Sequence, residues 1–292
     1  MQLVEVYTRV VLATFFWGAN FVLAVPVLHA LSPFWAAAYR FLLAAMVLLL
    51  VSLHQGAALR TLLQSHFTAI IGIAGIGIVG FNLLFFVSMQ YTSATNGALI
   101  MATNPLVTSL MAFIILAERP TLRQWVAVPL AFLGVIVVIS DGHLNQLLTL
   151  QLSRGDVLMV LANLAWAIYN VLSRRYLAGV PALAVTTLLM GVGGGMLLLM
   201  ALLSGERFTL PDAQAGSALA VMVLGGTVLA YWYWNAGIAR LGAPRTALFM
   251  NFVPLFAVLV AALGGVAPSA AQMAGGVLVI GSVVVATLRR QT

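Results

Sequence analysis

Two stretches of this chain, 149 residues apart, carry the same pattern around an interior proline. Residues 94–118 read ATNGALIMATNPLVTSLMAFIILAE and residues 243–267 read APRTALFMNFVPLFAVLVAALGGVA. Six of the first thirteen aligned positions are identical, including Pro105 and Pro254. A proline inside a helix removes one backbone hydrogen bond and kinks the helix. The shared pattern therefore predicts an internal repeat, with helix kinks at Pro105 and Pro254.

The chain is far too apolar for a soluble globular protein. Hydrophobic residues make up 63% of its 292 positions and charged residues only 7%, against about 25% charged residues in soluble proteins. A membrane-spanning helix needs about 20 apolar residues, and such runs occur at 7–28, 33–53, 67–90, 94–117, 122–140, 155–177, 181–203, 215–239, 243–264 and 270–288. The sequence therefore predicts an all-α integral membrane protein with ten transmembrane helices in the lipid bilayer.

The repeat divides these runs into two sets of five. The 149-residue offset aligns Trp17 with Trp166, and we expect a first repeat at 1–143 and a second at 144–292. Because five is an odd number, the two repeats enter the membrane from opposite sides and form an inverted pair. Proteins built this way tend to place a substrate near the middle of the membrane, between the repeats.

The arginines predict how the chain is oriented. The net charge of +7 comes from 13 arginines and no lysine, against six acidic residues. Most arginines lie beside apolar runs, which is typical of cytoplasmic loops rather than of a nucleic-acid-binding surface. With the N-terminus inside, ten arginines fall on the cytoplasmic side, and Arg154 and Arg207 fall outside. Both termini are therefore expected in the cytoplasm.

Several expected helices carry recognisable start signals. Ser32-Pro33 offers an N-cap followed by a proline at the first helical position, and Pro181 is expected in that same first position. Three other starts have the spacing of a capping box, namely Thr121 with Gln124, Ser153 with Asp156 and Ser269 with Gln272.

Glycines gather in four of the apolar runs. Those at 72, 75, 77 and 80, and those at 191 and 193–195, indicate either close packing or hinge motion. Those at 134, 275, 276 and 281 are interpreted as purely structural.

The sequence lacks the residues that membrane-embedded enzymes and metal sites need. It contains no cysteine, and its carboxylates and histidines all lie at the ends of apolar runs or between them. No H-E-x-x-H, G-x-S-x-G or Walker-type motif is present. We therefore expect no enzyme activity, no metal, no cofactor, and no proton pump built on a buried acid.

Arg40 stands apart because it lies about seven residues inside the second apolar run, where a charge costs a few kcal/mol. One interpretation is that Arg40 faces a cavity and binds a carboxylate or another polar group of a substrate. The other is that its side chain snorkels outward, or binds carbonyls freed by a kinked neighbouring helix. The sequence leaves both interpretations open.

Amide and aromatic side chains recur at helical spacing in both repeats. Asn163, Trp166 and Asn170 share one helix face, as do Tyr231 and Trp234. Contact between helices is the simpler interpretation for any single amide. The set as a whole favours an amphipathic cavity for a neutral or zwitterionic metabolite. The run YWYW at 231–234 covers all sides of a helix, so only Tyr231 and Trp234 are expected to face inward.

In their order and spacing, these residues resemble the drug/metabolite transporter superfamily, in particular its ten-helix EamA-type members. The first half is similar in Trp17-Gly18-Ala19-Asn20-Phe21, Arg40-Phe41, Pro105, Glu118-Arg119, Gln124 and Gly134. The second half is similar in Trp166, Ala243, Pro254, Gln272 and Gly281. It departs at Ala267, where a glutamate is common, and at Leu189, which aligns with Arg40. Arg40 is therefore expected to be the only buried charge.

The resemblance implies a secondary carrier of the bacterial inner membrane that works by alternating access. Such carriers usually export small molecules such as amino acids or related metabolites, and aromatic amino-acid exporters belong to the same superfamily. With no buried acid, we expect export or exchange driven by the substrate gradient rather than tight proton coupling. Exporters of other metabolites or drugs, and a non-transporting membrane scaffold subunit, are the alternatives. The expected lining of the substrate cavity is Trp17, Asn20, Arg40, Asn82, Met101, Asn104, Trp166, Tyr231, Trp234 and Asn251.

Overall fold

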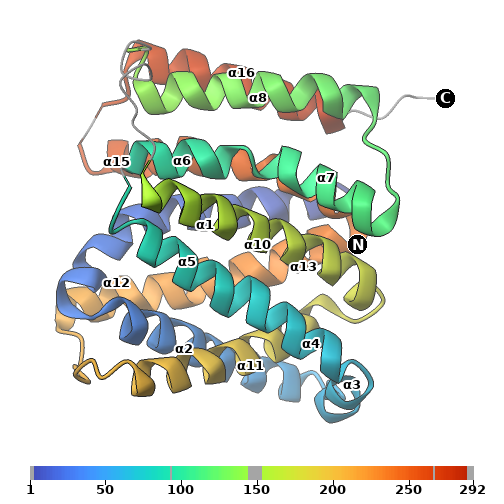
Figure 1. Ribbon diagram of the computed structural model, residues 1–292, viewed down its shortest axis with the longest axis vertical. Coiled ribbons are helices and arrows are strands. Elements are labelled where there is room, and N and C mark those ends of the chain that lie inside the picture. Colours follow the sequence, from blue (N-terminus) through green and yellow to red (C-terminus); the bar gives the residue numbers. More distant parts are fainter. Residues whose placement is uncertain (1–2, 93, 144–152, 266, 288–292) are drawn as a thin grey trace.

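The computed structural model describes residues 3–92, 94–143, 153–265 and 267–287, and every regular element in these ranges is helical (Figure 1). The first half contains α1 (Leu3–Ala30), α2 (Pro33–His54), α3 (Leu59–Ser65), α4 (Phe67–Ile73), η1 (Ala74–Gly80), α5 (Phe81–Ser88), α6 (Ala94–Ala102), α7 (Asn104–Leu116) and α8 (Leu122–Ser140). The second half contains α10 (Arg154–Leu177), α11 (Ala182–Leu203), α12 (Ala213–Val223), η2 (Leu224–Leu229), α13 (Ala230–Leu241), α14 (Ala243–Ala247), η3 (Leu248–Asn251), α15 (Phe252–Leu263) and α16 (Ala270–Thr287).

Among these described residues, seven helices are long and apolar enough to cross a membrane, and the bent helix α1 makes an eighth. Two further apolar helices, Asn104–Leu116 and Ala270–Ala286, are shorter. The protein is thus an all-helical, multi-pass membrane protein, and the count of ten spans stays a prediction. The bend in α1 measures 46° and lies just before Val22. Pro26 accounts for it, because the ring of a helical proline clashes with the carbonyl four residues earlier.

The helix starts follow the predicted caps with one exception. The capping boxes at Thr121 and Ser153 form, and Ser269 exchanges the same two hydrogen bonds with Gln272. The Ser32 side chain accepts from the backbone of Trp35 at the start of α2. The prediction for Pro181 is wrong by one residue. Its ψ of 127° is extended, so Pro181 is the N-cap and α11 begins at Ala182.

Two helices widen into π-helical turns at equivalent places in the repeat. In the first half the π-helical segment is η1, and in the second half it is η2. Adding 149 to residues 75–80 of η1 gives 224–229, the whole of η2. π-Helical turns are rare and are often found at functional sites.

Each π-helical segment has a glycine that lets the other half approach its backbone. A Cβ atom on Gly77 would lie 2.2 Å from Cδ2 of Tyr169, and one on Gly226 would lie 2.3 Å from Nδ2 of Asn20. Gly77 and Gly226 are 149 residues apart, and so are Asn20 and Tyr169. Close packing therefore accounts for these two glycines.

The two segments around the repeated prolines are also irregular. The first is interrupted at Thr103, directly before Asn104-Pro105, which divides it into α6 and α7. The second passes through the 3₁₀-helical segment η3, and Pro254 follows in the first turn of α15.

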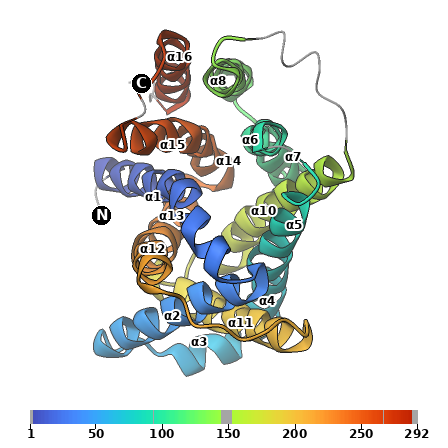
Figure 2. The same cartoon turned by 90° about the vertical axis from the view of Figure 1, so that its left-hand side faces the viewer.

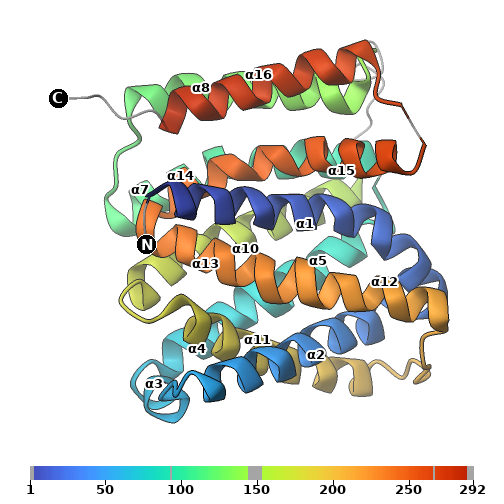
Figure 3. The same cartoon turned by 180° about the vertical axis from the view of Figure 1, so that it is seen from behind.

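The helices pack in pairs that respect the repeat. Equivalent helices of the two halves lie against each other, with α2 on α11 and α8 on α16 (Figure 3). α1 packs on α13 and α15, just as α10 packs on α5 and α7 (Figure 2). The first long helix of each half thus packs mainly on helices of the other half. This exchange is what an inverted pair of repeats is expected to produce.

At one end of the molecule the two halves meet around a small buried apolar cluster. There α7 packs on α14, and Ala112, Val171 and Ala243 are fully buried in a single cluster. We call this the arginine-rich end, because Arg174, Arg175, Arg240 and Arg245 lie at the adjoining ends of α10, α13 and α14.

Two of these arginines bind the ends of neighbouring helices. Arg174 Nη1 donates to the carbonyl of Ala239 at 2.6 Å, and Arg175 Nη1 donates to the carbonyl of Ile115 at 2.8 Å. The last carbonyls of a helix have no partner within the helix itself. The paired arginines of α10 therefore stabilise the C-terminal ends of α13 and α7 at the arginine-rich end of the molecule.

α8 and α16 touch through their backbones. A Cβ atom on Gly134 would lie 2.8 Å from the carbonyl oxygen of Gly275, and one on Gly275 would lie 2.7 Å from that of Gly134. These two glycines are structural, as predicted. Gly281 differs, because a Cβ atom there would meet nothing within 4 Å.

We expect Gly134→Ala to lower the melting temperature, although alanine is the better helix former, because the new methyl group forces α8 and α16 apart. Overpacking of this kind costs about 1–3 kcal/mol. Gly281→Ala is the matched control, since it has the same gain in helix propensity and no clash. Thermal unfolding of both variants in detergent, followed by size-exclusion chromatography, measures the difference. Equal stability of the two variants would contradict the backbone contact.

Candidate functional site

Four aromatic side chains from both halves meet at the centre of the molecule. Trp17 of α1 and Trp166 of α10 pack edge to face, with ring centroids 5.4 Å apart and planes at 82°. Tyr231 and Trp234 of α13 lie against Trp17 at 5.5 and 4.9 Å and against Trp166 at 5.7 and 6.1 Å. All four side chains are buried. We call them the aromatic cluster.

Two further rings extend the aromatic cluster and were not predicted. Tyr169 stacks on Trp166 with ring centroids 4.9 Å apart and planes within 9°, and Phe81 lies 5.1 Å from Trp166. The sequence held a signal for Tyr169, which lies one helical turn after Trp166 and aligns with Asn20 in the repeat. Phe81 has no comparable signal, because the third apolar run is rich in phenylalanine.

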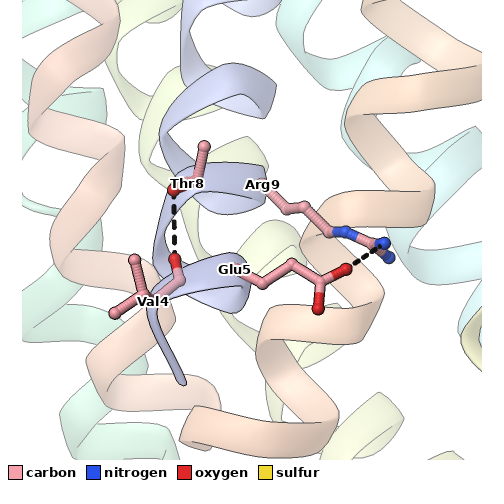
Figure 4. A network of polar contacts seen from close by, with 4 residues as sticks. All are labelled: Val4, Glu5, Thr8 and Arg9. Atoms are coloured by element: carbon pink, nitrogen blue, oxygen red, sulfur yellow. Dashed lines mark hydrogen bonds and ion pairs between the residues drawn. The ribbon is translucent and has the colours of Figure 1, made fainter. Parts of the chain in front are cut away.

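The prediction for the YWYW run is confirmed. Tyr231 and Trp234 are buried, whereas the other two rings are half-buried and face Arg9 of α1. The guanidinium carbon of Arg9 lies 6.0 Å from the ring centroid of Trp232 and 5.5 Å from that of Tyr233. Figure 4 shows Arg9 reaching back to Glu5, its ion-pair partner at 2.5 Å. The outward half of the run therefore packs on a charged pair near the N-terminus.

The π-helical segment η2 receives side-chain donors from two other helices. The carbonyl of Gly226 accepts from Trp17 Nε1 at 3.0 Å and from Arg40 Nη2 at 3.2 Å. Arg40 Nε also donates to Thr227 Oγ1 at 2.7 Å. Arg40 thus binds the backbone of an irregular neighbouring helix, as its second interpretation stated. Binding of a substrate by Arg40 stays a prediction.

The hydroxyl of Tyr231 and the side-chain amide of Asn82 lie near Arg40, beside the aromatic cluster. The Tyr231 side chain lies close enough to Asn82 and to Arg40 to interact electrostatically with both. Asn82 also donates from Nδ2 to the carbonyl of Ile78 at 2.6 Å, within the same span. Arg40, Asn82 and Tyr231 therefore form one polar group at the edge of the rings.

The second half of the repeat has an apolar version of this arrangement. Leu189 aligns with Arg40 and Ile78 aligns with Thr227, and a Cβ atom on Gly193 would lie 2.7 Å from Ile78. Trp166 is the equivalent of Trp17, but its Nε1 is buried without an acceptor among the described residues. The two halves share a geometry and differ in polarity.

Asn104 belongs to a separate network at the interruption between α6 and α7. Its Nδ2 donates to Asn163 Oδ1 at 2.6 Å, and Asn163 Nδ2 donates to the carbonyl of Ile100 and to Thr103 Oγ1, both at 2.8 Å. Asn163 of α10 therefore binds a carbonyl of the interrupted helix. These contacts correspond to the interpretation of the amides as links between helices.

The remaining predicted residues lie on three different elements. Asn20 of α1 packs on Gly226, as described above, and Met101 of α6 is half-buried. Asn251 closes η3, is 1% exposed, and has no hydrogen-bond partner among the described residues for either its Oδ1 or its Nδ2. A buried amide without partners is costly, so Asn251 is a further candidate for contact with a ligand.

The expectation that Arg40 is the only buried charge is wrong. Asp156, at the start of α10, is 3% exposed. Its carboxylate accepts from the backbone of Ser153 at 2.6 Å and from Thr92 Oγ1. A carboxylate is favourable at a helix N-terminus, where it binds free backbone N–H groups. The charged carboxylate of Asp156 can therefore be buried at the start of α10.

Two recesses lie in the described part of the chain, away from the aromatic cluster. One is bounded by Ser173, Val185 and Asn235 at the arginine-rich end. The other is bounded by His29 of α1 and by Asp212 and Gln214 at the start of α12. Neither is lined by a residue predicted to line the substrate cavity. In this conformation the predicted aromatic residues contact one another, and their role in lining a cavity stays a prediction.

Comparison with known proteins identifies relatives along nearly the whole chain. The model of the EamA-like transporter family matches twice, at residues 6–140 and 153–288. The uncharacterized transporter YyaM of Bacillus subtilis is 37% identical over 98% of this chain and 95% of its own length. A probable amino-acid metabolite efflux pump of Salmonella typhimurium is 26% identical over 90% of this chain and 88% of its own length.

The matches also include an inner membrane protein and a solved structure with a similar fold. The uncharacterized inner membrane transporter YedA of Escherichia coli K12 is 27% identical over 97% of this chain and 91% of its own length. A solved crystal structure superposes with a TM-score of 0.82 at 21% identity and covers 97% of both chains. The two family matches, one on each half of the repeat, and the relative at 37% identity show that this chain belongs to the EamA-like transporter family of the drug/metabolite transporter superfamily.

Proposed function

We propose that this chain is a secondary transporter, not an enzyme, that exports amino acids or related small metabolites by alternating access. The observation that carries the proposal is the aromatic cluster, where equivalent tryptophans of the two halves meet beside two equivalent π-helical segments. Broken or irregular helices at the interface of two repeats are the usual place of a transporter's substrate site. The relative named as a probable amino-acid metabolite efflux pump supports the choice of substrate class.

The proposed topology has ten spans, with the repeats divided between residues 143 and 144. α6 and α7 together form the fourth span, and α16 forms the tenth. The positive-inside rule then places the arginine-rich end and both termini in the cytoplasm of a bacterial cell, with the protein in the inner membrane. The packing of α7 on α14 closes the cytoplasmic side in this conformation.

The proposed substrate site combines the polar group and the rings. Arg40 supplies a fixed positive charge for a carboxylate, while Asn82 and the Tyr231 hydroxyl supply neutral hydrogen-bonding groups. Trp17, Trp166 and Trp234 offer apolar faces for a side chain. A small zwitterion with an apolar or aromatic side chain matches this combination. The other predicted lining residues, Asn20, Met101, Asn104 and Asn251, would become accessible as the two halves separate.

Counterflow in proteoliposomes tests this function. Vesicles are loaded with one unlabelled amino acid at a time, and a labelled tracer is added outside without any ion gradient. We expect transient accumulation of at least one tracer, because exchange needs only the substrate gradient. A pH gradient, imposed at zero membrane potential, should change the initial rate by less than about twofold. The buried acid that the structure describes, Asp156, lies at the start of α10, where Ser153 and Thr92 bind its carboxylate.

No accumulation by correctly inserted protein, with nucleosides, sugars and cationic drugs also tested, would overturn the carrier function. A several-fold response to the pH gradient, at fixed substrate ionisation, would overturn the prediction that coupling to protons is absent.

Arg40→Ala is expected to reduce counterflow of carboxylate-bearing substrates by at least about tenfold, because a charge-assisted hydrogen bond contributes about 1.5–3 kcal/mol. Arg40→Lys should retain part of the activity, since it keeps the charge but loses the planar pair of donors. Arg60→Ala, on the exposed short helix α3, removes the same charge as a control. Loss of folded Arg40→Ala protein in size-exclusion chromatography, with normal transport by the folded remainder, would assign Arg40 to support of η2 alone.

A further inference from the structure

The hydrogen bond between Trp17 and Gly226 has a counterpart in the repeat that is not formed. Trp17 Nε1 donates to the carbonyl of Gly226, 3.0 Å away. Shifting both residues by 149 gives Trp166 and Gly77. Trp166 Nε1 is buried and has no acceptor among the described residues. One of two equivalent bonds is made in this conformation, and the other is missing.

The missing hydrogen bond distinguishes Trp166 from other buried tryptophans of this protein. Two other buried tryptophans in the described part of the chain satisfy their N–H groups, since Trp234 donates to Asn170 Oδ1 at 2.8 Å and Trp35 donates to the carbonyl of Glu206 at 3.2 Å. Leaving a buried N–H group without an acceptor costs about 1–3 kcal/mol. A change of conformation that supplies an acceptor would therefore recover free energy at Trp166.

The surroundings of Gly77 suit that acceptor role. Gly77 lies in the π-helical segment η1 and has no side chain to block its carbonyl, as Gly226 has none in η2. η1 packs on α10, the helix that carries Trp166. Tyr169 of α10 already touches Gly77, just as Asn20 of α1 touches Gly226. The indole and its prospective acceptor thus lie on helices that are already in contact.

We propose that Trp17 and Trp166 exchange roles during transport, with the bond from Trp17 to Gly226 stabilising the conformation closed at the arginine-rich end and a bond from Trp166 to Gly77 stabilising the opposite conformation. This inference rests on the proposed alternating access. Each conformation then has one satisfied indole and one unsatisfied indole. Because of this exchange, the two conformations stay close in free energy. A carrier needs this closeness to populate both of them.

Cysteine labelling measures the two populations without knowledge of the substrate. The chain has no native cysteine, so a single Ala112→Cys reports on the arginine-rich end, where Ala112 is fully buried in the closed conformation. Ala243→Cys, buried in the same contact, is a second reporter in case the first destabilises the protein. The rate of reaction with a membrane-permeable maleimide in native membranes follows the fraction of open molecules.

The two chemically identical substitutions Trp17→Phe and Trp166→Phe are expected to act in opposite directions. Trp17→Phe removes the bond of the closed state, so labelling of Ala112→Cys should rise about fivefold. Trp166→Phe removes the bond of the open state, so labelling should fall about fivefold. A fivefold change corresponds to about 1 kcal/mol, the net contribution of one hydrogen bond. Trp125→Phe, on the exposed face of α8, is the matched control and should leave the labelling rate unchanged.

Opposite shifts with both reporters would support the exchange. Shifts in the same direction, or no shift in either variant while labelling after denaturation is normal, would overturn it, because a merely structural role loosens the protein in both variants. The assay is independent of the counterflow experiment. Counterflow without opposite labelling shifts would refute the exchange of indoles alone. Opposite labelling shifts without counterflow of any amino acid, but with counterflow of another compound of the panel, would instead refute the proposed substrate class alone.

Discussion

The need to hydrogen-bond backbone carbonyls in a membrane organises much of this structure. Lipid offers no donors, so a helix that is interrupted, widened or ended there needs donors from other helices. Arg40 and Trp17 bind the carbonyl of Gly226 in η2, and Asn163 binds that of Ile100 before the interruption of α6 and α7. The arginine pair at the end of α10 binds the final carbonyls of α7 and α13. Donors that look like candidates for ligand binding therefore also hold the irregular helices in place.

This constraint explains why the halves share a shape but not a chemistry. In both, the helix that carries the tryptophan packs on a π-helical segment of the other half, and both have an irregular turn before the repeated proline. Only the second half's segment, η2, receives an arginine, because Leu189 occupies the position equivalent to Arg40. The polar group of Arg40, Asn82 and Tyr231 therefore lies on one side of the aromatic cluster. For a zwitterionic substrate, such asymmetry would fix which end of the molecule faces the charge.

In the transport proposal, the contact of α7 with α14 at the arginine-rich end is the contact that opens. The two halves meet there around the buried Ala112 and Ala243, with Met111, Ile115 and Leu116 packed beside them. The aromatic cluster lies at the centre, where rings of both halves pack against one another. The indole of Trp166 is buried and unsatisfied in this conformation. A second conformation that offers this indole an acceptor would remove the cost of the unsatisfied N–H group.

The sequence by itself determined the helical membrane class, the positions of the helices, the repeat and the membership of the family, because apolar runs, caps and a repeated proline are local signals. Helical spacing and the repeat also predicted that Trp17, Trp166, Tyr231 and Trp234 face the interior of the protein. Only the tertiary structure decided that Arg40 binds η2, that Asn104 pairs with Asn163, that Asp156 is buried and that Tyr169 joins the aromatic rings. Those facts depend on contacts between helices up to 187 residues apart, and no spacing within one helix encodes which carbonyl of another helix needs a donor.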